Sequence, residues 1–362
     1  MADIRLLERT LADNLPWRKQ RINFLACFLM ALFQVKTVNL SEIAAVFRGR
    51  AKVLSHYKRI QRFLHVFEIG QADLARLVVR LMKLEAPFIL TFDRTEWKVG
   101  QQWINVLMLA IVRDGVAIPL LWSIWSKKGC SKNEQRNELL DRFLTIFGAE
   151  SVKFLCADRE FADTNWLPAL RQRGLNYRLR IKANATITDK HGRPMRADKI
   201  LQTMRIDEVL VCRRKRRLWG ETVYVSGVRR AAAAAAAGGE NVIVISSQAS
   251  KTILADYAKR WEIETLFGCF KTRGFRLEDT HVKETRRVGR LLSLLAVAFC
   301  WALLSGEWQC QQKPLKTKKH GRLEKSVFRV GFEILRRLFC TTDEEGRQKQ
   351  ESKRLISLLS CT

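Results

Sequence analysis

Two aspartates stand directly after apolar runs that are typical of buried strands. Asp93 follows the run Phe88–Phe92, and Asp158 follows the run Val152–Ala157. A carboxylate at the end of a buried strand costs free energy unless a partner offsets its charge. Either aspartate alone has an ordinary explanation as a turn or helix-cap residue. Two of them on neighbouring strands of one sheet favour shared coordination of a hard divalent cation.

The segment from Asp256 to Lys271 adds a third acid and two cations. Tyr257, Arg260, Glu264 and Lys271 are separated by three, four and seven positions. In a continuous helix, at about 100° per residue, all four would lie within a sector of roughly 60°. A solvated charged face with ordinary ion pairs is the alternative. The same helix has an apolar face suited to docking on a sheet, formed by Ile263, Leu266, Phe267 and Phe270.

The chain around Asp93 and Asp158 predicts a mixed α/β sheet. Three β-rich runs come first, and a hairpin signal, Arg113-Asp-Gly, separates the second from the third. The following segments alternate helix, strand, helix and strand, as in α/β proteins. The predicted strands are Phe88–Phe92, Trp103–Val112, Val116–Trp125, Val152–Ala157 and Tyr177–Ile181, and the predicted helices are Asn133–Phe147 and Thr164–Arg173.

The charge of the chain indicates a polyanionic partner. There are 65 Lys and Arg against 36 Asp and Glu, a formal net charge of +29. Nucleic acid would bind such a surface in a salt-dependent way, and an anionic membrane is the alternative. The apolar stretches Phe24–Val35 and Leu291–Ser305 fall short of the roughly 20 residues that span a bilayer, so they predict buried core helices. Scattered cysteines and a charged N-terminus predict reduced thiols and a cytoplasmic location.

The segments that flank the predicted sheet differ from it in composition. Near the N-terminus, Ser41–Phe47 and Ala51–Leu64 predict two helices joined by a turn that contains glycine. Two packed helices with solvated basic faces explain the same pattern. A cluster of basic residues in this part slightly favours DNA contact; it consists of Arg48, Arg50, Lys52, Lys58, Arg59 and Arg62.

The chain after the fifth predicted strand is polar and β-rich, which predicts an insertion domain. It contains the basic run Arg213–Arg217 and the low-complexity tract Ala231–Ala237, to which no function is assigned. A strand at Asn241–Ser246 and a long helix from Lys251 to Arg273 follow. An apolar helix near residues 290–305 and a basic C-terminal region complete the chain.

The pattern Tyr257-x2-Arg260-x3-Glu264-x6-Lys271 resembles the Y-R-E-K motif of bacterial insertion-sequence transposases of family four, which belong to the DDE group. The neighbouring segments Asp158-Arg-Glu-Phe and Lys271-Thr-Arg-Gly-Phe are also similar to sequences of that family. The resemblance implies a ribonuclease-H-like catalytic core. It implies cut-and-paste transposition of DNA, with element ends and target both double-stranded and with a homodimer in the complex.

The resemblance also implies a role for each site residue. Asp93, Asp158 and Glu264 would be catalytic and would bind two Mg²⁺ ions, for which Mn²⁺ can substitute. Tyr257, Arg260 and Lys271 would contact DNA. Arg180 and Lys182, at the end of the predicted fifth strand, are further candidates for the DNA backbone, whereas Trp261 is expected to pack in the core. Members of the family often carry a base-stacking tryptophan where this chain has Asn241, and Trp219 is a possible substitute.

Five regions follow from this interpretation. They are a helical DNA-binding domain at 1–82, a first part of the ribonuclease-H-like core at 83–183, a β-rich insertion domain at 184–249, a second part of the core at 250–306 and a basic region at 307–362. A non-catalytic DNA-binding inhibitor of transposition and a purely hydrolytic nuclease are the alternative functions. The expected location is the bacterial cytoplasm, on the nucleoid and not at a membrane.

Overall fold

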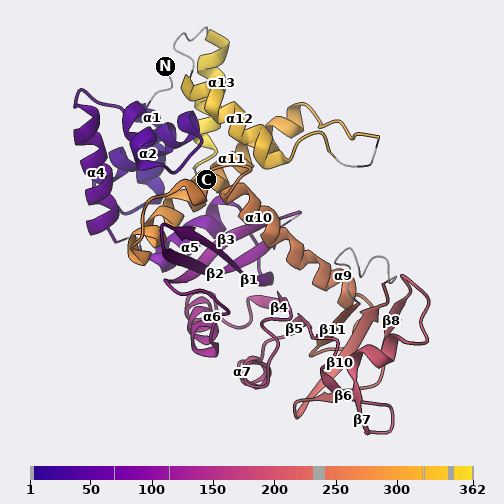
Figure 1. The fold of residues 1–362 in the computed structure, drawn as a ribbon. Helices are drawn as coiled ribbons and strands as arrows, with labels where there is room; N and C mark the ends of the chain where they lie inside the picture. The colour runs from indigo at the N-terminus through magenta and orange to yellow at the C-terminus, as the bar shows by residue number, and fades with distance from the viewer. Residues whose placement is uncertain are drawn as a thin grey trace.

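The computed structural model describes residues 4–68, 70–113, 115–230, 241–319, 321, 323–340 and 346–360. The tract Ala231–Ala237 lies outside the described residues. Helices flank one long mixed sheet, as Figure 1 shows. This architecture confirms the predicted α/β class.

The sheet begins with an antiparallel three-stranded unit and continues with parallel strands. β2 pairs with both β1 and β3 in antiparallel fashion, and β4 and β5 extend the sheet from β1 in parallel. β11 then joins β5, so the strands of the predicted insertion continue the same sheet. The strands are β1 (Phe88–Val99), β2 (Gln102–Arg113), β3 (Val116–Trp125), β4 (Val152–Ala157), β5 (Tyr177–Arg180), β6 (Thr186–Thr188), β7 (Pro194–Arg196), β8 (Val209–Val211), β9 (Arg216–Leu218), β10 (Glu221–Val228) and β11 (Val242–Ser246).

The first strand is longer than its apolar run predicts. Asp93 was expected at the end of the strand, but β1 continues to Val99 because its pairing with β2 runs as far as Val99 opposite Gln102. The pairing with β4 stops earlier, at Phe92 opposite Ala157. Asp93 therefore lies where β1 passes the end of β4, directly beside the start of the Asp158 loop.

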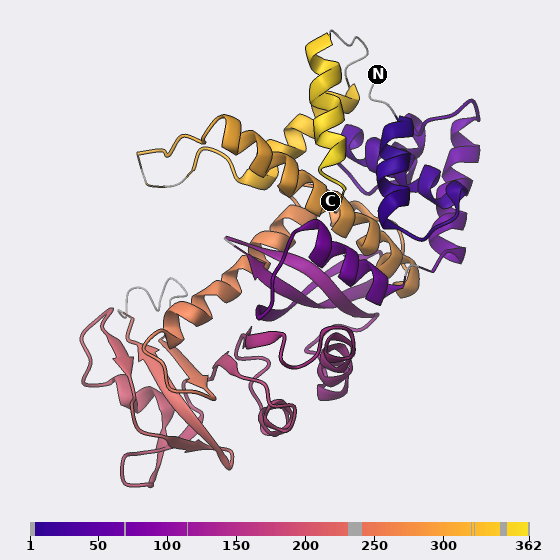
Figure 2. The ribbon, with the colours of Figure 1, turned by 180° about the vertical axis from the view of Figure 1, so that it is seen from behind.

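Helices cover both faces of the sheet (Figures 1 and 2). Alternate β1 residues reach α6 (Asn133–Phe147) and α7 (Trp166–Gln172): the ring of Phe88 packs against Phe143, and the ring of Phe92 packs against Trp166. Because side chains alternate along a strand, Asp93 points to the opposite face. That face carries α10 (Glu262–Phe270) and α11 (Thr285–Gln312).

The helix predicted from Lys251 to Arg273 is not continuous. It consists of α9 (Ile253–Ala258), a 3₁₀ turn at Lys259–Trp261 and α10. In both ribbon views this orange segment links the outer strands β10 and β11 to the first strands of the sheet. α9 packs on β5 and β11, whereas α10 packs on β1, β2 and β3. The sheet twists between these two contacts, and we attribute the break to that twist.

The N-terminal part is helical, with α1 (Ile4–Asn14), α2 (Lys19–Val35), α3 (Leu40–Val46), α4 (Val53–Val66) and α5 (Gln71–Leu81). The predicted pair of helices around the turn is present as α3 and α4. The residues of its basic cluster differ in how far they are buried. The Arg59 guanidinium lies near the rings of Phe24 and Phe47 and donates to Asn23 Oδ1 at 3.0 Å, so Arg59 is structural. The exposed members are Arg50, Lys52, Lys58 and Arg62.

The C-terminal helices α12 (Val327–Cys340) and α13 (Gly346–Ser357) return to the N-terminal ones. Gln34 Nε2 donates to the Phe339 carbonyl at 2.5 Å, and Trp301 Nε1 of α11 donates to the Leu355 carbonyl at 2.8 Å. α11 is long and apolar enough to cross a membrane, and so is the bent pair of α2 and α3 counted as one span. Buried residues make up 83% of the most apolar part of α11, as predicted for a core helix.

Two glycines let α11 and α12 cross at close range. A Cβ on Gly306 would overlap the backbone carbonyl of Val327, and a Cβ on Gly331 would overlap that of Ala302. Gly289, in the same α11, is different, because a Cβ there would meet Trp122 Nε1 and Ile124 Cδ1 at an ordinary 3.6 Å.

We therefore expect Gly331→Ala to destabilise the protein by roughly 2 kcal/mol, because the added methyl forces the two helices apart. Gly289→Ala is the matched control and should stabilise the protein by about 0.5 kcal/mol through its better helix propensity. Urea unfolding of the two variants measures both values. Equal effects would mean that the crossing is not limited by backbone contact.

Candidate active site

The carboxylates of Asp93 and Glu264 meet at one buried guanidinium. Arg260 Nη1 lies 3.0 Å from Asp93 Oδ2, and Arg260 Nη2 lies 2.9 Å from Glu264 Oε1. The Arg260 side chain is only 4% exposed, so its charge acts in a poorly solvated environment. The contact joins β1 to α10, and it brings together two acids separated by the whole insertion.

Asp158 reaches the same place through Tyr257 and Arg180. The Tyr257 hydroxyl donates to Asp158 Oδ1 at 3.1 Å, and Arg180 Nη1 lies 3.8 Å from the same oxygen. Burial raises the pKa of Tyr257, so the phenol keeps its proton and remains a donor. Five of the predicted residues are thus assembled in one site: the three acids, Tyr257 and Arg260, with Arg180 beside them.

The ionised form of Asp93 is held against an unfavourable environment. Burial raises the pKa of Asp93 from its ordinary 3.8 to about 6, and the charge of Arg260 opposes this rise. The negative charges of Glu160 and Glu264 raise it further. An anion with this balance would be stabilised by additional positive charge nearby.

The loop that carries Asp158 is fixed by a buried arginine of α6 that sequence reasoning missed. Arg136 is 3% exposed and donates to the Glu160 carbonyl at 3.0 Å and to Asp163 Oδ2 at 2.7 Å. Its guanidinium also lies 5.0 Å from the centre of the Phe161 ring. The Asp158-Arg-Glu-Phe segment was the available signal, since it contains two of these partners.

A second buried arginine positions α9. Arg178 of β5 is 4% exposed, and its Nε lies 3.5 Å from Asp256 Oδ2 on α9. Its Nη1 donates to Ser246 Oγ on β11 at 2.7 Å. Arg178 therefore ties α9 to the two strands beneath it, next to Tyr257. No signal in the sequence marked Arg178 as buried.

Lys271 and Trp261 differ from the remaining members of the motif. Lys271 follows α10, pairs with Glu278 at 2.7 Å and donates to the Glu96 carbonyl at 3.3 Å, so it contacts none of the three acids in the described structure. Trp261 was predicted to pack in the core, but it is 55% exposed, because helical spacing puts it opposite the apolar face that packs on the sheet. The Arg260 guanidinium lies 4.7 Å from the centre of its ring.

The remaining candidates lie at the edges of the site or away from it. Lys182 is exposed just after β5, and Trp219 is partly buried against the core. Asn241 accepts a hydrogen bond from the Arg230 backbone N–H at 2.8 Å.

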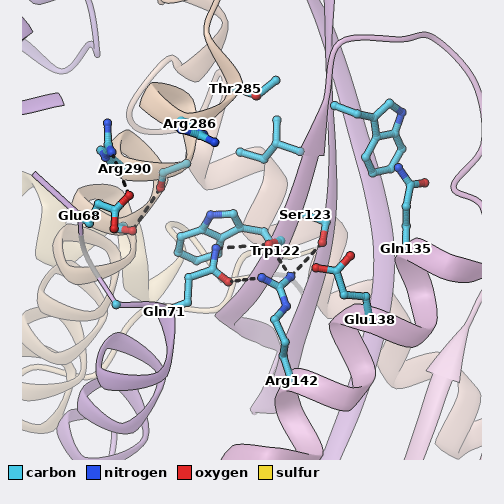
Figure 3. Close-up of a pocket in the computed structure, with 15 residues that line it drawn as sticks. Glu68, Gln71, Trp122, Ser123, Gln135, Glu138, Arg142, Thr285, Arg286 and Arg290 are labelled. Carbon is cyan, nitrogen blue, oxygen red and sulfur yellow. Dashed lines mark hydrogen bonds and ion pairs between the residues drawn. The ribbon is translucent and has the colours of Figure 1, made fainter. Parts of the chain in front are cut away.

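A cavity of about 690 Å³ lies elsewhere, between α5, β3, α6 and α11 (Figure 3). None of the three acids lines it. Arg142 closes part of its wall by donating to Gln71 Oε1, the Trp122 carbonyl and Ser123 Oγ at 3.0, 3.0 and 2.9 Å. These bonds tie α5 and β3 to α6, so we assign Arg142 a structural role.

A model of the transposase DDE domain family matches residues 83–301. The chain belongs to this family. The match spans Asp93, Asp158 and Glu264 and includes the long segment between the last two. No curated protein matches the chain. Membership of the DDE transposases makes DNA the substrate class, and such domains generally use divalent metal ions. The mixed sheet flanked by helices is consistent with a ribonuclease-H-like transposase domain.

The acids of this transposase domain suit a divalent metal by donor type. Carboxylate oxygens are the ligands that Mg²⁺ prefers, and the pKa of Asp93 is raised by burial despite the charge of Arg260. In the described residues, no three His, Cys, Asp or Glu side chains are grouped closely enough to form a metal site. The Arg260 guanidinium instead lies between Asp93 and Glu264 and supplies the positive charge there.

The raised pKa of Asp93 predicts a specific dependence of stability on pH. The folded-state pKa of Asp93 lies above its unfolded-state pKa. Its contribution to the free energy of unfolding is therefore fully present below about pH 4 and is lost as the pH rises through about 6. Asp93→Asn removes this loss. In urea unfolding with a chelator present, the variant should gain on the order of 2 kcal/mol relative to wild type between pH 4 and pH 7. Parallel stability curves would show that Asp93 ionises without cost.

Proposed function

We propose that this transposase binds the ends of a mobile DNA element and catalyses metal-dependent strand cleavage and strand transfer. The observation that supports this proposal best is that one helical segment contacts all three acids: Arg260 bonds Asp93 and Glu264, and Tyr257 bonds Asp158. The spacing of the four motif residues further supports assignment to family four of the insertion-sequence transposases.

In the proposed mechanism, Asp93, Asp158 and Glu264 would hold two Mg²⁺ ions. The chemistry that these ions supply when bound is activation of the attacking oxygen and stabilisation of the leaving 3′-oxygen. Attack by water would cut the strand, and attack by the freed 3′-hydroxyl would join it to target DNA. Both steps use the same acids.

The other residues of the site would position groups rather than transfer protons. The Tyr257 hydroxyl fixes the orientation of Asp158 and keeps its own proton. Arg260 offsets the mutual repulsion of the acids and, beside them, can also neutralise a phosphate oxygen. Arg180, beside Asp158, and Lys182 and Lys271, farther along the chain, would hold DNA phosphates on either side of the cut.

The exposed basic residues of α4 and the turn before it support a second part of the proposal. Arg50, Lys52, Lys58 and Arg62 form a basic surface on the N-terminal helices. We assign it to binding of the element ends, as part of a DNA-binding domain at 1–82. Because two ends must be joined in one complex, we also propose that two protomers assemble on DNA.

Glu264→Gln should abolish Mg²⁺-dependent cleavage and preserve DNA binding. The change keeps the size of the side chain and removes the charge that would hold a metal ion, whereas the basic surface is untouched. The assay is nicking of labelled duplexes that cover the ends of the DNA element encoding the chain, alongside gel-shift binding. Asp93→Asn and Asp158→Asn should give the same result. Wild-type cleavage by Glu264→Gln would contradict the proposed mechanism.

Lys271→Ala should behave differently from the acid variants. It removes a phosphate contact and leaves the three carboxylates in place, so cleavage should slow less severely and become more sensitive to salt. A strand-transfer assay with a target plasmid separates the alternatives: a purely hydrolytic nuclease would cut without joining, and an inhibitor would bind without cutting.

A further inference from the structure

The tip of the β1–β2 hairpin projects beyond the neighbouring strands. β4 ends opposite Phe92, and β3 ends at Trp125, opposite Asn105. The hairpin continues past both to the turn at Gly100, whose φ of 62° favours glycine. This tip belongs to the strand that carries Asp93, but it lies outside the cluster of acids.

Four exposed lysines from three segments gather at this tip, and we call them the tip lysines. Lys98 belongs to β1, Lys127 and Lys128 to the loop after β3, and Lys283 to the segment before α11. The Lys283 ammonium lies 3.6 Å from the position that a Cβ would take on Gly100. Gln102 of the hairpin also donates to the Lys283 carbonyl at 2.8 Å, which fixes that segment against the tip.

Trp103 holds two of the tip lysines in place. The ammonium groups of Lys98 and Lys128 lie 5.0 and 5.1 Å from the centre of its ring. Such cation–π contacts orient a lysine and leave its charge available, because the ring carries no negative charge to neutralise it. Positive charge is thus prearranged at the tip, and within the described residues none of the tip lysines forms an ion pair with a carboxylate.

The loop that carries Lys127 and Lys128 is anchored from inside. Asn105 is fully buried, and its amide donates to the carbonyls of Gly129 and Lys127 at 2.8 and 3.3 Å. The same amide lies 3.3 Å from Glu96 Oε2, and the Glu96 carbonyl accepts from Lys271 at 3.3 Å. Asn105 and Glu96 therefore connect the loop of Lys127 and Lys128 to Lys271 of the proposed catalytic motif.

We propose that the tip lysines form a second DNA contact, which holds backbone phosphates outside the cluster of acids. Lys98 lies five residue steps beyond Asp93, about 17 Å along an extended strand, and because side chains alternate along a strand it lies on the opposite face of the sheet from Asp93, so the contact is separate from the acids. The partner class rests on the proposed function, since the phosphates are those of the DNA that the site acts on. The contact reads phosphate and not base sequence, because lysine ammonium groups are its recognition elements.

A matched pair of double variants tests the contact. Lys98→Gln with Lys128→Gln removes two tip lysines, and Lys83→Gln with Lys153→Gln removes two exposed lysines at the opposite end of β1 and β4. Each pair lowers the formal charge of +29 by the same two units. Binding to a random-sequence duplex of about three helical turns is measured across a range of salt concentrations.

The tip pair should reduce the slope of log affinity against log salt by about 0.9 for each lost phosphate contact, and the opposite pair should leave it near wild type. Equal slopes in both pairs would overturn the proposal, since net charge alone would then explain binding.

The result of this binding test does not depend on the result of the cleavage assay. If Glu264→Gln proves inactive and the slopes of the two pairs coincide, only the tip contact is wrong. If no variant affects cleavage but the slopes differ, the tip contact stands and the catalytic assignment fails.

Discussion

The contact of Arg260 with Asp93 and Glu264 is the interaction on which the site depends. Gathering acids in a poorly solvated place raises their mutual repulsion and costs free energy unless a cation shares the space. The Arg260 guanidinium is nearly buried and bonds one acid with each terminal nitrogen. A lysine could not make this forked contact with its single ammonium group. The fold therefore has to bring Arg260 to Asp93 and Glu264, and it holds Asp158 nearby on Tyr257 and Arg180.

Two features of the fold make that arrangement possible. β1 and β4 are parallel neighbours, so Asp93 and Asp158 follow paired residues, Phe92 and Ala157. The helical segment of α9 and α10 passes over both strands, so that Tyr257 bonds Asp158 and Arg260 joins Glu264 to Asp93. Two buried arginines stabilise the elements on either side: Arg136 holds the Asp158 loop, and Arg178 holds α9.

Local sequence patterns were sufficient to predict most of the helices and strands and most residues of the candidate site. Apolar runs rich in β-forming residues predicted the strands, and helical spacing put Tyr257, Arg260 and Glu264 on one face. The break at Lys259–Trp261 was not predictable, because it arises from packing on two parts of a twisted sheet. Trp261 was wrongly placed in the core, although helical spacing puts it opposite the apolar face of the segment. The burial of Arg136 and Arg178 was not predicted, because arginine usually lies at the surface and their burial depends on partners distant in sequence.

The net charge of +29 overstates the positive charge that DNA can contact. Part of the basic content is internal: Arg59, Arg136, Arg178 and Arg260 are buried or partly buried against rings, carboxylates and carbonyls. The planar guanidinium suits these sites because it makes several directed bonds and packs on aromatic rings. The hairpin tip uses lysine instead, whose ammonium remains exposed on its flexible stem. Arginine thus stabilises the acid-rich centre, and lysine supplies the charge that an external polyanion can contact.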